Sequence, residues 1–461
     1  MAAALGVLVS CGSVKSGEEV VAASRDSKVV VAYVTSWSEV MPDPQYMTHI
    51  NYAFGHVNES FNGVKIDNEE RLRQIVDLRK QKPELKVLLS IGGWGSGRFS
   101  EMAANDEYRR AFAADCDRVV KEFALDGIDI DWEYPTSSMA NISSSPDDTE
   151  NFTLLMQDIR AAIGNEKELT LATVASARYI DFKAILPSVD FVNIMAYDMA
   201  SAPKHHSALY PSGHSGDITS DGAVTAHLKA GVPPSKLVMG MPFYGRGGDG
   251  YPSFQDYNKV GNTDTQYTEK WDEVAQVPYL ADKNDTLVFG FENPRSLAIK
   301  CQYILDKDLL GGMYWDYSGD NEQGDLRRTV AENLLGKPHK AKVLVLTERG
   351  GQHGGFTDAG LRWLAAEGVK GNFSITEINN ARNITEAYLS QFSLVIQLDF
   401  PPYTWPKEAE DAFVKYIEEG RGGWIGFHHA TLLGEFDGYP MWQWFSDFMG
   451  GVRFKNYIAP L

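Results

Sequence analysis

Cysteine is scarce in this sequence, with only three residues, at positions 11, 116 and 301. Cys116 and Cys301 fall in helix-like stretches far apart in the chain, so two buried free thiols are expected and not a disulfide framework. Apart from a short run at the N-terminus, apolar segments are also short, and none approaches the roughly 20 residues that a membrane-spanning helix needs. These absences exclude a disulfide-stapled scaffold and an integral membrane protein.

Positive charge is also in short supply. Lys and Arg number 43 against 62 Asp and Glu, which gives a net charge of −19. Nucleic-acid binding depends on Lys and Arg neutralising phosphates, so no nucleic-acid partner is expected. A neutral sugar polymer fits this charge better, and 21 Tyr, 10 Trp and 22 Phe supply aromatic faces on which sugar rings stack.

The N-terminus is the one place where a targeting segment is expected. Residues 1–11 form a short apolar run that ends in Leu8-Val-Ser-Cys11 and resembles a bacterial lipoprotein signal. The resemblance implies a lipid anchor on Cys11, a polar tether over residues 12–27, and an extracytoplasmic protein that is membrane-anchored or, alternatively, secreted. No Lys or Arg precedes the apolar run, so a frayed terminus without signal function is the other interpretation.

No internal repeat or low-complexity tract interrupts the chain, and its 461 residues are too many for one ordinary domain. Over residues 28–336, short β-rich runs alternate with amphipathic segments such as 68–81 and 107–125, the pattern of a parallel sheet with crossover helices. Eight such units predict an α/β fold, a (β/α)8 TIM barrel. The expected strands are Val29–Thr35, His49–Phe54, Lys86–Ile91, Gly127–Tyr134, Leu169–Val174, Asp190–Tyr197, Lys236–Pro242 and Gly311–Trp315.

A second domain is expected over residues 341–461, after the linker-like Gly336-Lys-Pro-His-Lys340. Its β-rich runs alternate with helix-like ones, and a glycine-rich turn follows the first strand, which indicates a flavodoxin-like α/β fold. The expected strands are 341–347, 393–398 and 423–428, and the expected helices are 358–367 and 407–419.

The strongest chemical signal is the run Asp126-Gly-Ile-Asp-Ile-Asp-Trp-Glu133. Side chains alternate faces along a strand, so Asp129, Asp131 and Glu133 share one face. The apolar residues between them face the other way and, in a barrel, pack beneath the helices. An exposed edge strand also alternates acids with apolar residues, but an edge strand does not fit the centre of a parallel array.

Three inward carboxylates cannot all ionise cheaply, so the outermost is expected to have a raised pKa. A raised pKa suits a general acid that donates a proton near neutral pH. Glu133 is nearest the C-terminal end of the strand, the end at which barrel enzymes carry their active sites. We therefore predict that Glu133 is a catalytic acid.

Asp126, Asp129, Asp131 and Glu133 have the spacing D-x-x-D-x-D-x-E, which resembles the family 18 glycoside hydrolases. Four further motifs follow the family's order: Ser90-Ile-Gly-Gly-Trp94, Met195-Ala-Tyr-Asp198, Gly240-Met-Pro-Phe-Tyr-Gly-Arg246 and Gly312-Met-Tyr-Trp315. The resemblance covers the whole barrel. It implies retaining, substrate-assisted hydrolysis of β-1,4-N-acetylglucosamine linkages, as in an endo-acting chitinase, without metal or cofactor. The implied partner is chitin or another glycan that contains N-acetylglucosamine.

The resemblance also implies roles for individual residues. Glu133 protonates the glycosidic oxygen while the substrate's own acetamido oxygen attacks the anomeric carbon. Asp131 orients the acetamide and Asp129 holds Asp131, while Tyr197 hydrogen-bonds the acetamido oxygen. Asp126 is a structural residue. The implied substrate-binding residues, with Trp315 as the floor beneath the sugar, are Asp198, Trp315, Tyr33, Phe54, Trp94, Met195, Tyr244 and Arg246.

Three features bear on how substrate is held. Trp94 fits a packed barrel residue as well as it fits a substrate contact. Phe291-Glu-Asn293 stands where family members often have Tyr-Asp-Asp, which puts subsite contacts there in doubt. Only residues 247–270 separate Arg246 from Trp271, too few for the small α/β insertion that walls one side of the cleft in many exo-acting members. A shallower, open groove is therefore expected, and it favours internal cleavage or bulky substrates.

Two other functions stay open at this point. An endo-β-N-acetylglucosaminidase cuts the core of N-glycans with the same chemistry, and some barrels of this family have lost the acid and bind chitin as lectins. Glu133, present together with Asp131 and Tyr197, argues against a lectin because binding alone needs no proton donor. Trp132-Glu-Tyr-Pro135 resembles chitinases more than it resembles the N-glycan enzymes.

The second domain resembles the ThuA-like trehalose-utilisation family. The motifs that carry the resemblance are Val343-Leu-Val-Leu-Thr347, Gln352-His353 and Gly422-Gly-Trp-Ile-Gly-Phe-His-His-Ala-Thr431. The match covers residues 341–461, about half of such a domain, so a truncated domain is expected. His353, His428 and His429 line a sugar or metal site in one interpretation and are satisfied loop histidines in the other. No cysteine follows Cys301, so the thiol nucleophile of an amidotransferase is absent.

Overall fold

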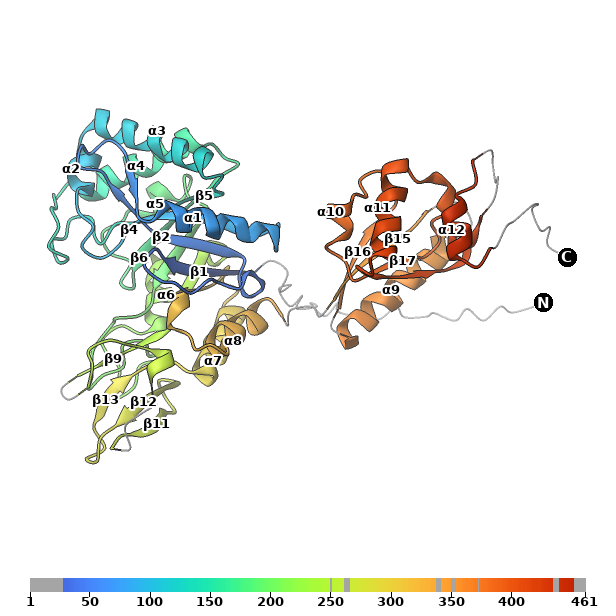
Figure 1. Cartoon of the computed structure of the whole chain (residues 1–461). Helices are drawn as coiled ribbons and strands as arrows, with labels where there is room; N and C mark the ends of the chain where they lie inside the picture. The colour runs from blue at the N-terminus through green and yellow to red at the C-terminus, as the bar shows by residue number, and fades with distance from the viewer. Residues whose placement is uncertain are drawn as a thin grey trace, which may run out of the picture. The chain divides into compact units, whose positions relative to one another are not determined.

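The computed structural model describes residues 28–451 except 249–250, 261–265, 337–340, 350–353, 372 and 434–438. The signal and tether expected over residues 1–27, with Cys11, lie outside the described residues, as does His353. The chain divides after Gly336 into two compact units (Figure 1).

The first unit is a closed barrel of eight parallel strands, which confirms the predicted (β/α)8 fold. The strands run in the order β1-β14-β8-β7-β6-β5-β4-β2, and a further β1–β2 pairing closes the ring. Their bounds are β1 Val29–Thr35, β2 His49–Val57, β4 Lys86–Gly92, β5 Gly127–Asp131, β6 Glu168–Val174, β7 Phe191–Met195, β8 Leu237–Pro242 and β14 Gly311–Trp315. A short strand β3, Val64–Ile66, pairs antiparallel with the end of β2.

Helices pack around the barrel and bury its outer face. The helices are α1 Glu69–Val76, α2 Phe99–Ala104, α3 Asp106–Glu122, α4 Asp148–Ile163, α5 Phe182–Ile185, α6 Ser220–Lys229, α7 Pro294–Asp306 and α8 Asp325–Leu334. The segment expected to be one helix over 68–81 divides into α1 and a 3-10 turn, η3, over Asp77–Lys80. Cys116 and Cys301 are buried free thiols, as predicted. Among the described residues, no helix is both long and apolar enough to cross a membrane.

Two barrel strands end earlier than the sequence indicated, and both ends matter for the site. β5 ends at Asp131 and not at Tyr134, because its neighbour β4 pairs with it only as far as Gly92. Gly92 has φ +133°, and a Cβ there would lie 1.9 Å from the Asp131 carbonyl oxygen, so only glycine fits where the strands part. β7 likewise ends at Met195. Glu133 and Tyr197 therefore follow their strands and are not part of them.

An antiparallel sheet is inserted between β8 and α7, contrary to the expectation from the short 247–270 segment. Its order is β10-β9-β13-β12-β11. The expectation was wrong because the insertion continues past Trp271 as far as Gly290, so counting only to Trp271 missed two of its strands. The strands are β9 Tyr244–Gly247, β10 Gln255–Asp256, β11 Thr268–Asp272, β12 Val277–Ala281 and β13 Leu287–Gly290, with a 3-10 turn η5 at Tyr257–Lys259.

The second unit is a four-stranded parallel sheet in the order β16-β15-β17-β18, which confirms the flavodoxin-like prediction. The strands are β15 Ala341–Leu346, β16 Phe373–Ile378, β17 Leu394–Gln397 and β18 Gly423–Gly426. The helices are α9 Gly354–Gly371, α10 Glu386–Leu389, α11 Lys407–Glu418 and α12 Gln443–Phe448, and a 3-10 turn η9 spans His428–Thr431. The sequence did not reveal β16, a half-buried edge strand that carries Ser, Thr and Glu.

Candidate active site

Asp129 lies at the centre of the barrel, fully buried, and its carboxylate is saturated with hydrogen bonds. Its donors come from β1, β4, β6 and β7: Tyr33 Oη (2.8 Å), Ser90 Oγ (2.8 Å), Thr170 Oγ1 (2.6 Å) and Asn193 Nδ2 (3.3 Å). Burial raises the pKa of Asp129, and the four hydrogen bonds oppose that rise. Such a carboxylate is positioned rigidly and has no capacity left for a ligand.

Asp131 lies two residues further along the same face but in a different state. It is 4% exposed, and within the described residues its Oδ1 atom has no hydrogen-bond partner. Burial raises the pKa of Asp131 well above its ordinary value, and the charges of Glu133 and Asp129 raise it further. A buried acceptor without a partner is costly, so this oxygen is suited to receive a donor from a bound molecule.

Glu133 lies just beyond the end of β5, as predicted for the outermost acid. Burial raises its pKa to about 7, the charge of Asp198 contributes to the rise, and a hydrogen bond from Tyr134 opposes it. The Tyr134 ring is itself held by a stacked contact with Tyr179, with ring centroids 5.5 Å apart. Trp132 points outward and stacks on Phe99 at 5.3 Å, which confirms the alternation of faces along this run.

Aromatic rings line the mouth of the barrel beside these acids. Trp315, at the end of β14, stacks on Phe54 with centroids 5.5 Å apart and planes 21° apart, and Tyr33 lies 5.6 Å from it. Trp37, which sequence reasoning missed, lies 6.5 Å from Trp315 and is 64% exposed. Its position two residues after β1, on the catalytic face of the barrel, was the available signal.

Trp94 follows β4 and is 62% exposed, so the interpretation of a packed barrel residue is wrong. Its ring meets Tyr134 edge-on at 6.5 Å. Met195 is half-buried and packs inside the barrel against a cluster that includes Tyr33 and Phe54. Trp94 and Met195 were both implied for substrate binding, but their exposure differs. Trp94 presents an open ring face to solvent, whereas Met195 packs in the barrel interior.

Tyr197 and Asp198 directly follow the carboxyl end of β7, at the catalytic face of the barrel. The half-buried Tyr197 hydroxyl donates to Sδ of Met313 at 3.8 Å. Asp198 accepts two hydrogen bonds from Arg246, at 2.7 and 2.6 Å, and lies 3.4 Å from Nδ1 of His206. Burial by itself would raise the pKa of Asp198, but the bonds from Arg246 and His206 outweigh it and hold that pKa well below its usual range.

Tyr244, the last of the residues implied for the site, is buried beside this ion pair. Its ring meets Tyr197 edge-on at 6.1 Å and lies 5.3 Å from the Arg246 guanidinium. The inserted sheet thus supplies both Arg246 and Tyr244, on β9, to the neighbourhood of Asp198. Sequence reasoning did not foresee the sheet that carries these two residues.

Glu292 is the middle residue of Phe291-Glu-Asn293, which stands where family members often have Tyr-Asp-Asp. Its side chain does not line the substrate groove. It is 1% exposed and pairs with the fully buried Lys300, and Ser207 Oγ donates to it at 2.6 Å. Asp126, expected to be structural, lies at the other end of β5, where it accepts a hydrogen bond from the Val87 backbone at 2.8 Å. Neither residue lies with the acids at the catalytic face.

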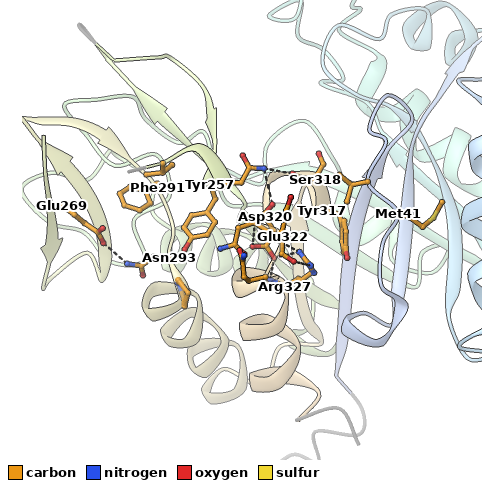
Figure 2. A pocket seen from close by; sticks show the side chains of 16 residues that line it. Met41, Tyr257, Glu269, Phe291, Asn293, Tyr317, Ser318, Asp320, Glu322 and Arg327 are labelled. Atoms are coloured by element: carbon orange, nitrogen blue, oxygen red, sulfur yellow. Dashed lines mark hydrogen bonds and ion pairs between the residues drawn. The ribbon is translucent and has the colours of Figure 1, made fainter. Parts of the chain in front are cut away.

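A cavity of about 900 Å³ lies between the inserted sheet and the N-terminal ends of α7 and α8 (Figure 2). Its wall combines aromatic rings, among them Tyr257 and Tyr317, with polar groups such as Asn321 and Glu322. The loop after β1 completes the wall with Met41, four residues beyond Trp37. Among the described residues, no group of three or more His, Cys, Asp or Glu side chains could hold a metal ion.

Two family models match the chain, one over each unit. The model described as Glycosyl hydrolases family 18 matches residues 29–320. The model described as Trehalose utilisation matches residues 342–460. Both resemblances expected from the motifs are thereby confirmed.

Individual proteins also match this chain. Chitinase A1 of Niallia circulans is 30% identical, and the match covers 66% of this chain but only 58% of that protein's length. Chitotriosidase-1 of Mus musculus is 31% identical, with 64% of this chain and 74% of that protein covered. A solved family 18 N-acetylglucosaminidase from Paenibacillus barengoltzii is 32% identical with a TM-score of 0.62, over 66% of this chain and 99% of that one.

Proposed function

Because the chain belongs to family 18 of the glycoside hydrolases, we propose that its barrel hydrolyses the β-1,4 linkages of chitin. One observation carries the proposal: the three carboxylates along β5 and just beyond its end differ in a graded way. Asp129 is saturated, Asp131 keeps one oxygen without a partner among the described residues, and burial raises the pKa of Glu133 to about 7. That gradation supplies a fixed support, a ligand acceptor and a proton donor along one face.

The proposed reaction uses Glu133 as general acid. Its proton passes to the glycosidic oxygen as the bond from that oxygen to the anomeric carbon breaks, and the substrate's acetamido oxygen forms a bond to the same carbon. The product is an oxazolinium ion. Water then attacks the anomeric carbon, gives its proton to the Glu133 carboxylate and opens the ring with retention.

The neighbouring groups stabilise this intermediate. Asp131 accepts the acetamido N–H through its unpartnered Oδ1, which orients the acetamide and offsets the positive charge of the ring. Tyr197 donates its hydroxyl to the acetamido oxygen. Trp315 and Phe54 form the apolar floor under the sugar, and the Asp198–Arg246 pair borders it.

We also propose that the enzyme cleaves internal bonds. The supporting observation is that two exposed tryptophans lie near different parts of the site, Trp37 after β1 beside Trp315 and Trp94 after β4 beside Tyr134. Sugar rings stack on such faces, so a chain longer than one sugar can be held at more than one point. The loop of Trp37 continues to Met41 in the cavity wall, and we place additional sugar units of a long chain there.

Parallel digestion tests the substrate. Chitin oligosaccharides, a high-mannose glycoprotein and cellulose oligosaccharides are incubated with the full chain, and the products are separated by mass. We expect chitin fragments of several lengths and an intact N-glycan, and we expect a thiazoline mimic of the oxazolinium to inhibit. Cleavage of the N-glycan core would instead support the endo-β-N-acetylglucosaminidase. Rapid cellulose hydrolysis would contradict substrate assistance, and binding without any hydrolysis would support a lectin.

An extracytoplasmic location, with a lipid anchor on Cys11, completes the proposal. It rests on the resemblance of residues 1–11 to a lipoprotein signal and on an insoluble polymeric substrate that cannot enter a cell. Labelled palmitate should enter the full chain and not a Cys11→Ser variant. Equal labelling of both would contradict the anchor.

A further inference from the structure

His206 is a fully buried histidine beside the candidate active site, and the proposed reaction does not use it. It lies in the segment between β7 and α6. Its Nδ1 atom lies 3.4 Å from Oδ1 of Asp198, and its Nε2 atom has no hydrogen-bond partner among the described residues. A buried polar atom without a partner is costly, and an apolar side chain would avoid that cost. The contact with Asp198 is therefore what distinguishes this imidazole from an apolar side chain of similar size.

Asp198 needs support because its backbone is in an unfavourable conformation. Its φ is +54°, in the left-handed region that favours glycine. Non-glycine residues keep such a conformation only where the surrounding structure holds them, and they concentrate at functional sites. The backbone carbonyl of His206 accepts a hydrogen bond from the N–H of Met199, the residue after Asp198, at 3.0 Å. His206 thus contacts the Asp198 carboxylate with its ring and fixes the neighbouring backbone with its carbonyl.

The Asp198 carboxylate has one partly exposed partner and one buried partner. Arg246 donates two hydrogen bonds to it, at 2.7 and 2.6 Å, and the Arg246 side chain is 32% exposed. The His206 ring contacts the same carboxylate without any exposed surface. Its distance is at the long end for a hydrogen bond, and hydrogen bonds in free enzymes often have this length and tighten in the substrate complex. Together the two partners leave the carboxylate little freedom to turn.

Two strands of the inserted sheet pack around His206. β9 places the ring of Tyr244 with its centroid 5.3 Å from that of the imidazole. The end of β13 lies against the backbone, since a Cβ on Gly290 would be 3.7 Å from the His206 nitrogen. His206 is therefore enclosed between the inserted sheet and the loop that carries Asp198.

The charged groups on these elements leave Asp198 as the acid that faces the imidazole. Arg246, on β9, is bound to Asp198 itself. Glu292, after β13, is paired with Lys300 and accepts a hydrogen bond from Ser207. Within the part of the chain that the structure describes, Asp198 is the acid at ion-pair distance from the His206 ring.

The position of Asp198 matters for the catalytic acid. Burial is the main cause of the raised pKa of Glu133, and the charge of Asp198 adds to it. Coulomb energies fall with distance, so a carboxylate that turns away from Glu133 raises that pKa less. A residue that holds Asp198 therefore influences the acid without touching the substrate.

We propose that His206 is a positioning residue, which holds the Asp198 carboxylate from the buried side of the site and acts through Asp198 on the sugar and on Glu133. This inference rests on the proposed function, because the sugar and the acid are those of chitin hydrolysis. The contact between His206 and Asp198 can be tested without substrate.

Substitutions in the full chain test this role. His206→Asn keeps an N–H donor at the place of Nδ1, whereas His206→Leu removes the donor and keeps a similar volume. The matched control is His227→Leu, because His227 on α6 is an equally buried histidine, and its Nδ1 lies 2.8 Å from the Ala223 carbonyl oxygen and not at the site. We expect kcat/KM for chitin oligosaccharides to fall about ten- to hundredfold in His206→Leu, mainly through kcat, because a displaced group in an active site costs that much. His206→Asn and His227→Leu should stay within about threefold of the natural chain.

Two measurements without substrate separate positioning from a purely structural role. Difference infrared spectroscopy against Glu133→Gln follows the titration of the Glu133 carboxyl group. Its midpoint should move to lower pH in His206→Leu and stay in place in His206→Asn and His227→Leu. Urea unfolding of a double-mutant cycle with Asp198→Ala measures the contact itself. His206→Leu should cost less stability in the Asp198→Ala background than in the natural chain, because the contact is already absent there.

A Glu133 titration that does not move in folded His206→Leu, or stability effects of His206→Leu and Asp198→Ala that simply add, would overturn the proposal. If His206→Leu does not fold, His206→Gln replaces it in both measurements, since its amide lies at the place of Nε2, away from Asp198. A natural chain that fails to hydrolyse chitin would contradict the proposed function. The titration and the unfolding cycle would still test His206 in that case, so the two failures are distinguishable.

Discussion

Both units place acids at the carboxyl ends of parallel strands, but Asp131 in the barrel and Glu348 in the second unit differ in their exposure to solvent. In the barrel the sheet closes on itself, so Asp129 and Asp131 are buried and burial raises both pKa values. In the second unit the sheet is open, and Glu348 and His429 keep a quarter or more of their side-chain surface exposed. Closure of the barrel removes Asp129 and Asp131 from water, whereas the Glu348 side chain at the edge of the open sheet stays partly exposed.

Removing the titratable group of the barrel should have the largest effect. Glu133→Gln keeps the shape of the side chain but removes the transferable proton, so we expect turnover of chitin oligosaccharides to fall on the order of 10²–10⁴-fold with substrate still bound. Steady-state kinetics and calorimetric binding measure the two effects. Glu107→Gln, on the outer helix α3, is the matched control and should retain full activity. Full activity in Glu133→Gln would rule out the assignment.

Weakening the support of Asp129 should have an intermediate effect. Tyr33→Phe removes one donor to a buried carboxylate, which should lower the free energy of unfolding by about 1–3 kcal/mol. It should also raise the pKa of Asp129 further, since this bond opposes the rise caused by burial. Urea unfolding measures the loss of stability, with Tyr108→Phe on α3 as the control. Equal stability of the two variants would mean that the Tyr33 bond adds nothing.

A smaller effect is expected at the cavity. Glu322→Ala removes a polar group from the cavity wall and should raise KM for long chitin oligosaccharides by about two- to tenfold, the cost of one hydrogen bond. We expect a trimer to be held at the acids without occupying the cavity, so its KM should not change. Glu332→Ala, further along α8, is the control. The same KM change for both lengths would show that the cavity does not hold the chain.

The smallest effect should come from deleting the second unit. A chain that ends at residue 338 keeps all eight barrel strands and every proposed catalytic group, so its activity should stay within about twofold of the full chain. Circular dichroism and chitin hydrolysis are measured together. A folded but inactive barrel would mean that the second unit contributes to the site, and loss of folding would mean that the two units share a core.

The sequence predicted the strands of the barrel and the inward direction of Asp129 and Asp131 better than the form of its loops. Alternation along residues 127–133 identified the inward acids because period-two patterning survives burial. The insertion went unrecognised because its short strands pair only with one another, across turns, and no single segment shows a strong pattern. Trp37 was missed for a related reason, since a lone aromatic residue in a loop has no periodicity.

The hydrogen bonds within the two units could not be predicted from the sequence either. The four donors to Asp129 come from four different strands and converge only when the barrel closes. The Glu348–His429 pair joins residues 81 positions apart in the chain. Edge strand β16 was missed because its polar residues weaken the signal of a buried strand.

The pH dependence of kcat/KM tests most directly whether burial makes Glu133 the acid. Glu133 donates only in its protonated form, and its pKa is raised to about 7. Activity on chitin oligosaccharides should therefore be highest below that value and fall about tenfold per pH unit above it. The residual activity of Glu133→Gln should not show this alkaline limb. Activity that stays constant from well below to well above pH 7, or an alkaline limb that persists in Glu133→Gln, would contradict the account.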